Sequence, residues 1–354
     1  MDKRDSVKKI NVGGIEIGGG APVSVQTMCN TKTWDVDATV AQIKAMQVAG
    51  ADIVRLAIPD MRAAQAISEI KEKTEVPLVA DIHFDYKLAL EVAERGIDKI
   101  RINPGNIGGE ENVKAVADAC RRHNIPIRIG VNAGSLEKKL LEKYGHPCPE
   151  ALVESAQGHA ALLEKFDFED ICISMKSSSV PLTIAAYRLA ADTFRYPLHL
   201  GVTETGTEWN GTIQSAVGIG TLLSEGIGNT IRVSLTADPV REVSAGIAIV
   251  KAAGLRPGGV RFVSCPTCGR TEIDLIGLAT EVENRVRNMK RDITVAVMGC
   301  VVNGPGEARE ADYGIAGGRG KGLLFKKGEV LGTYNFDELS DRLIDLINSD
   351  GENA

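Results

Sequence analysis

From residue 22 to residue 253 the chain alternates short β-branched runs with longer amphipathic stretches of helical period. Each run has the length of a strand, and each following stretch repeats its apolar residues three and four positions apart, as one buried helix face requires. The unit occurs eight times. The predicted strands cover residues 22–27, 52–58, 78–82, 99–103, 126–132, 170–176, 198–203 and 230–236.

Eight strand-helix units in about 230 residues match the typical size of a (β/α)8 TIM barrel. A doubly wound open sheet, the other arrangement that alternating units allow, does not ordinarily need eight such regular units. We therefore predict an α/β protein whose first domain, residues 1–254, is a TIM barrel. Residues 2–20 are predicted to form a small hairpin that plugs the bottom of the barrel.

Beyond the barrel the pattern changes. A helix is predicted over 272–289, a strand over 293–298 and a last helix over 336–348. Gly328 separates two β-rich runs and is expected to form a hairpin turn. Residues 255–354 are therefore predicted to be a separate, smaller α+β domain, within the usual range of domain sizes.

Several predicted barrel strands carry cations, although a strand that is buried on both faces is normally apolar throughout. In residues 99–103, two isoleucines alternate with Lys99, Arg101 and Asn103. Because side chains alternate between the faces of a strand, the apolar set can pack on the helices while the polar set points into the barrel. The same pattern in other strands and at their ends adds Arg55, Asp81, His83, Arg128, Asn132, Lys176, Glu204, Arg232 and Ser234.

Five of the basic side chains are expected to meet at the C-terminal end of the barrel, where TIM-barrel sites lie: Arg55, Arg101, Arg128, Lys176 and Arg232. For any one of them, an ion pair with a carboxylate such as Asp52, Asp81 or Glu204 is the simpler interpretation. Two or three carboxylates cannot neutralise five cations, however, and an unpaired charge removed from water costs several kcal/mol. A polyanionic ligand is therefore expected, and a diphosphate suits the planar fork of arginine best.

Three further features each admit two interpretations. His83 can donate a proton or contact phosphate, or it can be a core histidine bonded to Asp81. The turn at 105–110 can offer backbone N–H groups to a phosphate, or it simply begins a helix. The basic loop at 317–322 can dock an acidic redox partner, or it is a plain hairpin or bulge.

Three cysteines lie in Gly/Pro-rich turns of the second domain. Cys265 and Cys268 form a Cys-x2-Cys pair, and Cys300 follows the predicted strand 293–298. Three thiols predict a metal site with an incomplete ligand set, because closed zinc and iron-sulfur sites usually take four ligands. This domain contains no histidine, so a fourth zinc ligand would be a carboxylate, for which Glu307 is the candidate. Zinc and an iron-sulfur cluster both remain open at this point.

The remaining composition narrows the class of protein. The net charge of −6 over 354 residues argues against a basic surface for nucleic acid. We find no apolar stretch long enough to span a bilayer and no signal peptide, so we expect a cytoplasmic protein without membrane or nucleic-acid partners. In such a protein the other four cysteines are expected to be small buried hydrophobes: Cys29, Cys120, Cys148 and Cys172.

The cysteine runs Cys-Pro-Thr-Cys-Gly-Arg and Met-Gly-Cys-Val-Val-Asn-Gly-Pro-Gly-Glu-Ala closely resemble those of the 4-hydroxy-3-methylbut-2-enyl diphosphate synthases of the non-mevalonate isoprenoid pathway. The resemblance covers essentially the whole chain, through motifs such as Ala80-Asp-Ile-His-Phe, Arg101-Ile-Asn-Pro-Gly-Asn and Ser174-Met-Lys-Ser-Ser. It implies the compact bacterial form, because no large extra domain separates the barrel from the cysteine module.

This resemblance implies a [4Fe-4S] cluster held by Cys265, Cys268, Cys300 and Glu307. The implied substrate is the cyclic diphosphate of 2-C-methyl-D-erythritol, and the implied reaction is a two-electron reductive ring opening with loss of water. Reduced flavodoxin or ferredoxin is the expected electron donor. The family also implies a homodimer in which the cluster of one subunit caps the barrel of the other.

The resemblance further assigns roles to single residues. Glu204 is implied to assist protonation and departure of the C3 hydroxyl, and we hypothesise that substrate displaces Glu307 from the cluster. The residues implied to hold the diphosphate are Arg55, Arg101, Arg128, Asn132, Lys176, Arg232 and Ser234, and the strand pattern adds His83 and Asn103.

Two rival functions remain open from the residues alone. One is a non-redox barrel enzyme that binds a phosphate ester, similar to dihydropteroate synthases, with a C-terminal module stapled by zinc. The other is a ferredoxin-like electron carrier fused to an inert barrel, although this module lacks the fourth cysteine that such a carrier needs. Iron and sulfide analysis of anaerobically purified protein would separate the three.

Overall fold

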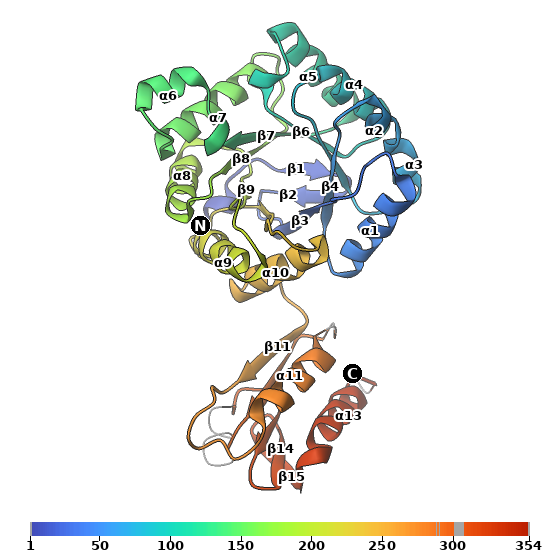
Figure 1. The fold of residues 1–354 in the computed structure, drawn as a ribbon, viewed down its shortest axis with the longest axis vertical. Helices are drawn as coiled ribbons and strands as arrows, with labels where there is room; N and C mark the ends of the chain where they lie inside the picture. The colour runs from blue at the N-terminus through green and yellow to red at the C-terminus, as the bar shows by residue number, and fades with distance from the viewer. Residues whose placement is uncertain (1, 288, 290, 301–307, 353–354) are drawn as a thin grey trace. The chain divides into compact units, whose positions relative to one another are not determined.

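The computed structural model describes residues 2–287, 289, 291–300 and 308–352. The chain divides into two compact units, Met1–Arg256 and Pro257–Ala354, and each is described by itself (Figure 1). Among the described helices, none is both long and apolar enough to cross a membrane.

The first unit is a closed barrel of eight parallel strands, which confirms the predicted TIM barrel. Strands β3 to β8 pair in chain order, and β10 pairs with both β3 and β9. A single bridge between Ile173 and Leu198 closes the remaining gap. The strands are β3 (Ser24–Met28), β4 (Ile53–Ala57), β5 (Leu78–Asp81), β6 (Lys99–Ile102), β7 (Ile127–Asn132), β8 (Ile171–Lys176), β9 (His199–Leu200) and β10 (Thr230–Ile231).

Helices surround this barrel as an outer ring (Figure 1). Many begin at an aspartate or serine that accepts a backbone N–H of the first turn, as Asp35, Asp60 and Ser179 do. The helices are α1 (Val36–Val48), α2 (Met61–Gln65), α3 (Ile67–Glu72), α4 (Tyr86–Glu94), α5 (Glu110–His123), α6 (Lys138–Tyr144), α7 (Pro149–Glu164), α8 (Val180–Thr193), α9 (Glu208–Ser224) and α10 (Pro239–Ala252), with the 3-10 turns η1 (Lys3–Asp5), η2 (Pro104–Asn106) and η3 (Ala133–Ser135).

The N-terminal hairpin closes the lower end of the barrel, as predicted. Strands β1 (Ile10–Val12) and β2 (Ile15–Ile17) pair antiparallel. Their apolar side chains pack against Ile53, Val79 and Cys172, which lie in the lower parts of β4, β5 and β8. The site must therefore open at the other end.

The last two barrel strands are shorter than the sequence pattern predicts. Beyond β9 and β10 the ladder continues as separate hydrogen bonds, from Arg232 N–H to Leu200 O (3.0 Å) and from Thr203 N–H to Ser177 O (3.2 Å). Position 201 in this irregular stretch has no room for a side chain, because a Cβ there would lie 2.7 Å from both Arg232 O and Lys176 Nζ. Glycine is therefore required at this position. The side chains after β9 and β10 still reach the mouth of the barrel.

The second unit is a mixed five-stranded sheet whose strand order follows the sequence, β11-β12-β13-β14-β15. The first three strands are parallel, and Gly328 forms the predicted hairpin between β14 and β15. The predicted helix over 272–289 is shorter because Asp274 caps it by accepting the Gly277 N–H. The elements are β11 (Val260–Ser264), α11 (Leu275–Val286), β12 (Ile293–Met298), β13 (Tyr313–Gly317), β14 (Lys321–Lys326), β15 (Glu329–Asn335), η4 (Phe336–Glu338) and α13 (Leu339–Glu352).

Candidate active site

The C-terminal ends of the barrel strands surround a cavity of about 230 Å³. All five predicted basic side chains line it, so the strand alternation placed them correctly. They come from five different strands or strand ends and are accompanied by polar residues of the same layer. The lining residues are Arg55, Asp81, His83, Arg101, Arg128, Asn132, Ser174, Lys176, Thr203, Arg232 and Ser234.

Asp81 contributes a carboxylate to the lining of this cavity. Its Oδ1 accepts from Arg101 Nη1 (3.1 Å), and its Oδ2 lies 3.8 Å from Arg55 Nε. His83 Nε2 lies 3.7 Å from the same oxygen, while its ring remains largely exposed. Burial alone would raise the pKa of Asp81, but Arg55, His83 and Arg101 together hold that pKa well below its usual range. Asp81 is therefore ionised and orients two arginines.

The other side of the cavity holds two further arginines. Arg128, which is 1% exposed, donates from Nη1 to Ser174 Oγ (2.7 Å). Arg232 Nη2 lies 3.2 Å from Glu242 Oε2, a buried carboxylate on α10. The sequence pattern did not indicate Glu242, because a single glutamate on a helix resembles any solvent-facing residue.

The site carries more positive than negative charge. Among the described residues, no carboxylate lies within ion-pair distance of Lys176, which is 7% exposed. Burial and then the neighbouring arginines, Arg232 first, hold the pKa of Lys176 well below its usual value. Burial likewise lowers the pKa of Arg128 to about 10. Cations held at this cost before any ligand is present are arranged to receive an anion.

Glu204 lies in a neighbouring cavity of about 310 Å³, which shares Asn132, Lys176 and Thr203 with the cationic cavity. Its backbone has a φ of 57°, in the left-handed region that non-glycine residues seldom adopt. Thr205 Oγ1 donates to Ser234 O (2.5 Å), which holds the chain directly after Glu204. A residue with a strained backbone conformation beside a cationic cavity is typical of functional sites.

Not every predicted residue reaches the cationic cavity. Asn103 does not line it, because the chain turns into η2 directly after this residue, and its buried Oδ1 has no hydrogen-bond partner. The backbone N–H of Gly105 in the same loop donates to His159 Nδ1 (3.2 Å) and so is not available to a phosphate. Ser174 and Thr203 do line the cavity, and their positions in the alternating strands could have indicated them.

Two of the three cysteines of the second unit follow neighbouring strands, at the same end of its sheet. Cys265 directly follows β11, and Cys300 follows β12 after Gly299. These strands are adjacent and parallel, with Ser264 opposite Val297, so both cysteines leave the sheet at the same end. Gly299 N–H donates to Cys265 Sγ (3.2 Å). Backbone N–H groups that donate to sulfur stabilise a thiolate, the form that binds metal.

Cys268 is exposed and lies in the loop that leads from Cys265 to α11. Hydrogen bonds from the backbone and side chain of Arg270, with help from Thr271, lower the pKa of the Cys268 thiol. Among the described residues, no three metal-ligating side chains form a group that could hold an ion. Glu307, the predicted fourth ligand, lies outside the described residues. The donor chemistry fits a thiolate-bound cluster, although the described part of the site does not complete its cage.

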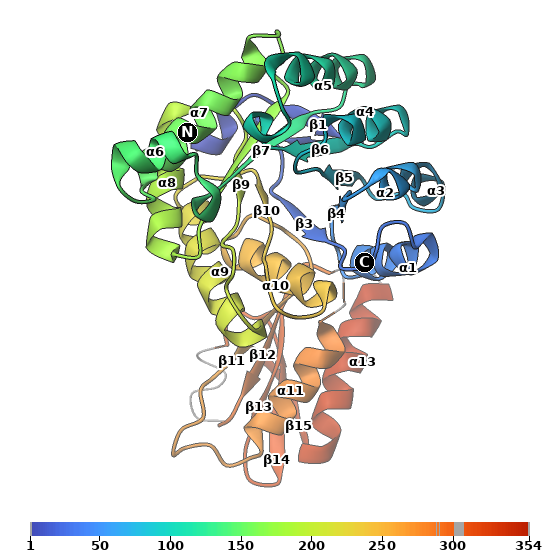
Figure 2. The same cartoon turned by 45° about the horizontal axis from the view of Figure 1, so that its top comes forward.

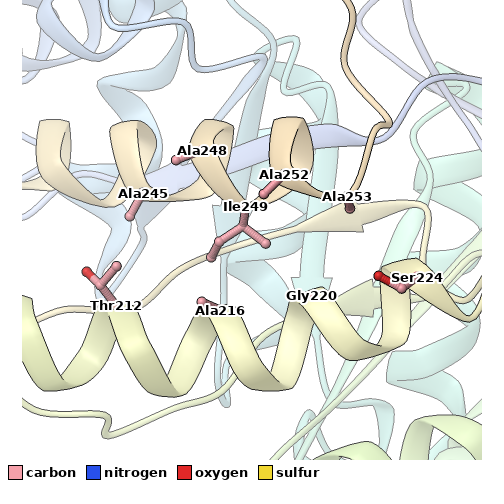
Figure 3. A pocket seen from close by; sticks show the side chains of 9 residues that line it. All are labelled: Thr212, Ala216, Gly220, Ser224, Ala245, Ala248, Ile249, Ala252 and Ala253. Atoms are coloured by element: carbon pink, nitrogen blue, oxygen red, sulfur yellow. The ribbon is translucent and has the colours of Figure 1, made fainter. Parts of the chain in front are cut away.

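A second hollow of the barrel unit lies on its outer surface between α9 and α10, which run side by side (Figures 2 and 3). Its volume is about 390 Å³, and its lining consists of small residues and Ile249 without any titratable side chain. Its lining therefore offers no group that titrates near neutral pH for acid-base catalysis.

Fold and site together define a TIM-barrel protein with a cation-lined cavity at the mouth of its barrel, joined to a smaller thiol-bearing domain. The chain belongs to the GcpE family: residues 7–247 match the GcpE TIM-barrel domain and residues 261–349 match the GcpE protein C-terminal domain.

Close relatives match over nearly the full chain. A protein of Clostridium perfringens named 4-hydroxy-3-methylbut-2-en-1-yl diphosphate synthase (flavodoxin) is 60% identical over 97% of this chain and 99% of its own length. A protein of the same name from Geobacter sulfurreducens is 59% identical over 95% of this chain and 96% of its own length. The family that the cysteine runs resemble is thereby confirmed.

Solved structures with a similar barrel are far more distant in sequence. The dihydropteroate synthase of Yersinia pestis matches with a TM-score of 0.50 and 15% identity, covering 70% of this chain and 98% of that structure. The 3-dehydroquinate dehydratase of Geobacillus kaustophilus matches with a TM-score of 0.50 and 14% identity, covering 71% and 99%. Two different enzymes on one fold show the barrel architecture alone.

Proposed function

We propose that this protein converts 2-C-methyl-D-erythritol 2,4-cyclodiphosphate to 4-hydroxy-3-methylbut-2-enyl diphosphate, a step of isoprenoid precursor biosynthesis. The observation that carries the proposal is the cationic cavity, where five buried or partly buried cations face only Asp81 and Glu242 as ion-pair partners among the described residues. The close relatives named as synthases of this product support the same reaction.

The barrel is proposed to bind the diphosphate and to control protons. The arginines and Lys176 neutralise the phosphate oxygens, because charge-assisted bonds from buried cations are strong and oriented. They also stabilise the phosphate oxygen that departs with its electron pair when the ring opens at C2. Glu204, in the adjoining cavity, delivers a proton to the C3 hydroxyl, which leaves as water. The ring opening consumes two electrons and forms the carbon-carbon double bond.

The second domain is proposed to bind a [4Fe-4S] cluster through Cys265, Cys268, Cys300 and Glu307. Such a cluster supplies electrons to the substrate one at a time. The depressed pKa of Cys268 and the N–H bond to Cys265 Sγ support thiolate ligation. Zinc needs no electron donor, whereas the names of the relatives specify flavodoxin, so the zinc-stapled alternative is less well supported.

Anaerobic purification followed by an activity assay tests the function. Brown protein with about four iron and four sulfide per chain, and formation of the linear product with reduced flavodoxin, is the expected result. Colourless protein with one zinc would support the non-redox barrel instead. A stable cluster in a chain that does not turn over the cyclic diphosphate would support the electron-carrier alternative.

Flavodoxin is proposed as the electron donor, in agreement with the names of the relatives, and ferredoxin is the competitor. Assays with each carrier at the same reduction level compare the two directly. A cytoplasmic location is also proposed, because free thiols and reduced carriers are maintained there. Cell fractionation checks that location.

Replacing Glu307 by cysteine is expected to retain a cluster and to lose turnover. A fourth thiolate binds iron more firmly than a carboxylate does, so that position becomes harder for a substrate oxygen to occupy. Iron content and the visible spectrum measure the cluster, and product formation measures turnover. Full activity in the Glu307→Cys variant would show that this position does not need an exchangeable ligand.

The protein is proposed to be a homodimer, and the barrel surface at α9 supports this. Trp209, Ile213 and Val217 are 77%, 45% and 51% exposed and recur every four residues, so they form one row along α9. On the neighbouring stripe of α9, Thr212, Ala216 and Gly220 line the groove of small residues (Figure 3). Protruding side chains next to a groove on one face are self-complementary about a two-fold axis. An exposed apolar row of this kind marks a contact surface.

Trp209→Glu is therefore expected to convert the dimer to a monomer, raising the dimer dissociation constant about 30-fold or more, since buried tryptophans dominate interfaces. Sedimentation velocity measures the change. Val48→Glu is the control, because Val48 is an even more exposed apolar residue (91%) on a different helix, α1. A Trp209→Glu protein that remains dimeric would remove this face from the interface.

A separate experiment tests whether the two domains that act on one substrate come from different chains. It measures the activity of mixed dimers formed from two inactive variants.

A further inference from the structure

His159 on α7 is a buried histidine outside the cationic cavity. Its side chain is 5% exposed, and its two ring nitrogens face two different loops. Nδ1 accepts the backbone N–H of Gly105 (3.2 Å), and Nε2 lies 2.8 Å from Glu137 Oε1. Ser155, one turn earlier on α7, donates to the same Glu137 oxygen (3.0 Å). The ring therefore bridges two segments that are distant in sequence.

The two segments follow neighbouring barrel strands at the mouth. Gly105 lies in η2, directly after β6, and Glu137 ends the short segment that leads from β7 to α6. That segment begins at Asn132, which lines both the cationic cavity and the cavity of Glu204. Residues 133–135 line the second cavity. This segment forms one wall of the site. A contact that fixes the position of Glu137 therefore also restricts the position of this wall.

The chemistry of the ring suits a fixed bridge. Because Nδ1 accepts a backbone N–H, the ring proton is on Nε2, which lies 2.8 Å from Glu137 Oε1 in a close polar contact whose angle falls outside hydrogen-bond geometry. Burial lowers the pKa of His159, against the opposing effect of Glu137, so the neutral ring that this bonding requires is favoured. Gly105 is required for the close approach, since a Cβ at this position would lie 2.6 Å from His159 Cε1.

We propose that His159 is a positioning residue for the substrate site: by tying the loop after β6 to the segment after β7, it fixes the wall that carries Asn132. The proposal rests on the proposed function, because it concerns the same diphosphate site. His159 itself contacts neither cavity of that site. Its loss is therefore expected to weaken substrate binding rather than to remove a reacting group.

The surroundings of the ring make a chemical test possible. His159, Gly105 and Glu137 line a separate cavity of about 620 Å³. In a His159→Ala variant, imidazole can enter from this cavity and restore both contacts without a covalent link. 1-Methylimidazole has one acceptor nitrogen and no N–H, so it can replace one contact only.

The experiment measures steady-state kinetics of the cluster-loaded enzyme and, separately, substrate affinity by calorimetry. His159→Ala is expected to raise KM and Kd about tenfold or more while kcat changes little, because the Gly105 N–H and the Glu137 carboxylate lose the ring that joins their two segments. Added imidazole should lower both constants toward the wild-type values, and 1-methylimidazole should do so less. His159→Asn and His159→Gln, which retain chiefly the Gly105 and the Glu137 contact respectively, should give intermediate values.

His123→Ala is the matched control, because His123 also lies beside a glutamate, Glu94 (3.2 Å), but on the outer surface of α5. That variant is expected to bind and turn over substrate as the wild type does. If His159→Ala lowers the melting temperature but leaves KM and Kd unchanged, or if imidazole restores nothing, the positioning role is wrong. Wild-type turnover decides the proposed function independently, so the two failures are distinguishable.

Discussion

Replacing Lys176 by methionine is expected to lower kcat/KM about 10²- to 10³-fold while making the substrate-free protein more stable. The loss arises because a buried cation of the proposed diphosphate site is removed, and truncating one partner of a buried charge pair costs about 2–5 kcal/mol. The gain arises because the free site buries Lys176 without an ion-pair partner among the described residues, which costs folding free energy whether the side chain loses its proton or keeps its charge. Methionine has a similar length and no charge, so unfolding should require about 1–3 kcal/mol more free energy.

Lys99→Met is the matched control for this substitution. Lys99 is fully buried inside the barrel, its Nζ has no hydrogen-bond partner, and burial lowers its pKa to about 8. It does not line the cationic cavity. Lys99→Met should therefore raise the melting temperature without changing KM or substrate affinity. If both variants bind substrate normally, the diphosphate does not lie against Lys176.

The lowered pKa of Lys176 also predicts the pH dependence. A polyanion raises the pKa again, so substrate binding takes up protons, and the affinity falls as pH rises through the pKa of the free site. Because the folded pKa lies below that of the unfolded chain, the folding penalty is absent above about pH 10.5 and grows as pH falls toward the folded value. Calorimetry in buffers of different ionisation enthalpy measures the proton uptake, which Lys176→Met should reduce.

Replacing Cys268 by serine is expected to remove the cluster and all reductive turnover. Serine is a poor ligand for iron, and two remaining thiols do not retain a [4Fe-4S] cluster. Iron and sulfide should fall from about four per chain to near zero, and the visible absorption should disappear. Substrate affinity should change little, because the diphosphate ligands belong to the barrel. The variant therefore separates binding from reduction.

Cys120→Ala is the control for Cys268→Ser. Cys120 is completely buried on α5, and burial raises the pKa of its thiol to about 12, as expected for a packing residue. Its substitution should leave the iron content unchanged and cost only packing stability. A Cys268→Ser protein that keeps a full cluster and normal turnover would exclude Cys268 as a ligand.

Most of the architecture follows from the chain itself. Eight β-branched runs separated by amphipathic stretches can bury their apolar faces only as a closed or doubly wound α/β sheet, and their number favours the barrel. The alternation of Ile100 and Ile102 with Lys99 and Arg101 settles which side chains point inward, because the period of a strand is two residues. The Cys265-x2-Cys268 pair, taken together with Cys300 on a second Gly-rich turn, likewise predicts a metal site from the sequence. These properties are local, so the order of residues is sufficient to specify them.

Only the tertiary structure determines which ion pairs the inward-pointing side chains form and which of these side chains line the cationic cavity. Glu242 reaches Arg232 from a helix, and His159 contacts Gly105, which lies 54 positions earlier in the chain; only chain folding brings such residues together. Asn103 follows the same alternation as Arg101 but leaves the cavity, because the backbone turns at Pro104. The charge imbalance around Lys176 also depends on distances between strands. Periodicity determines which face a side chain takes, whereas its partners are determined by the packing of distant segments.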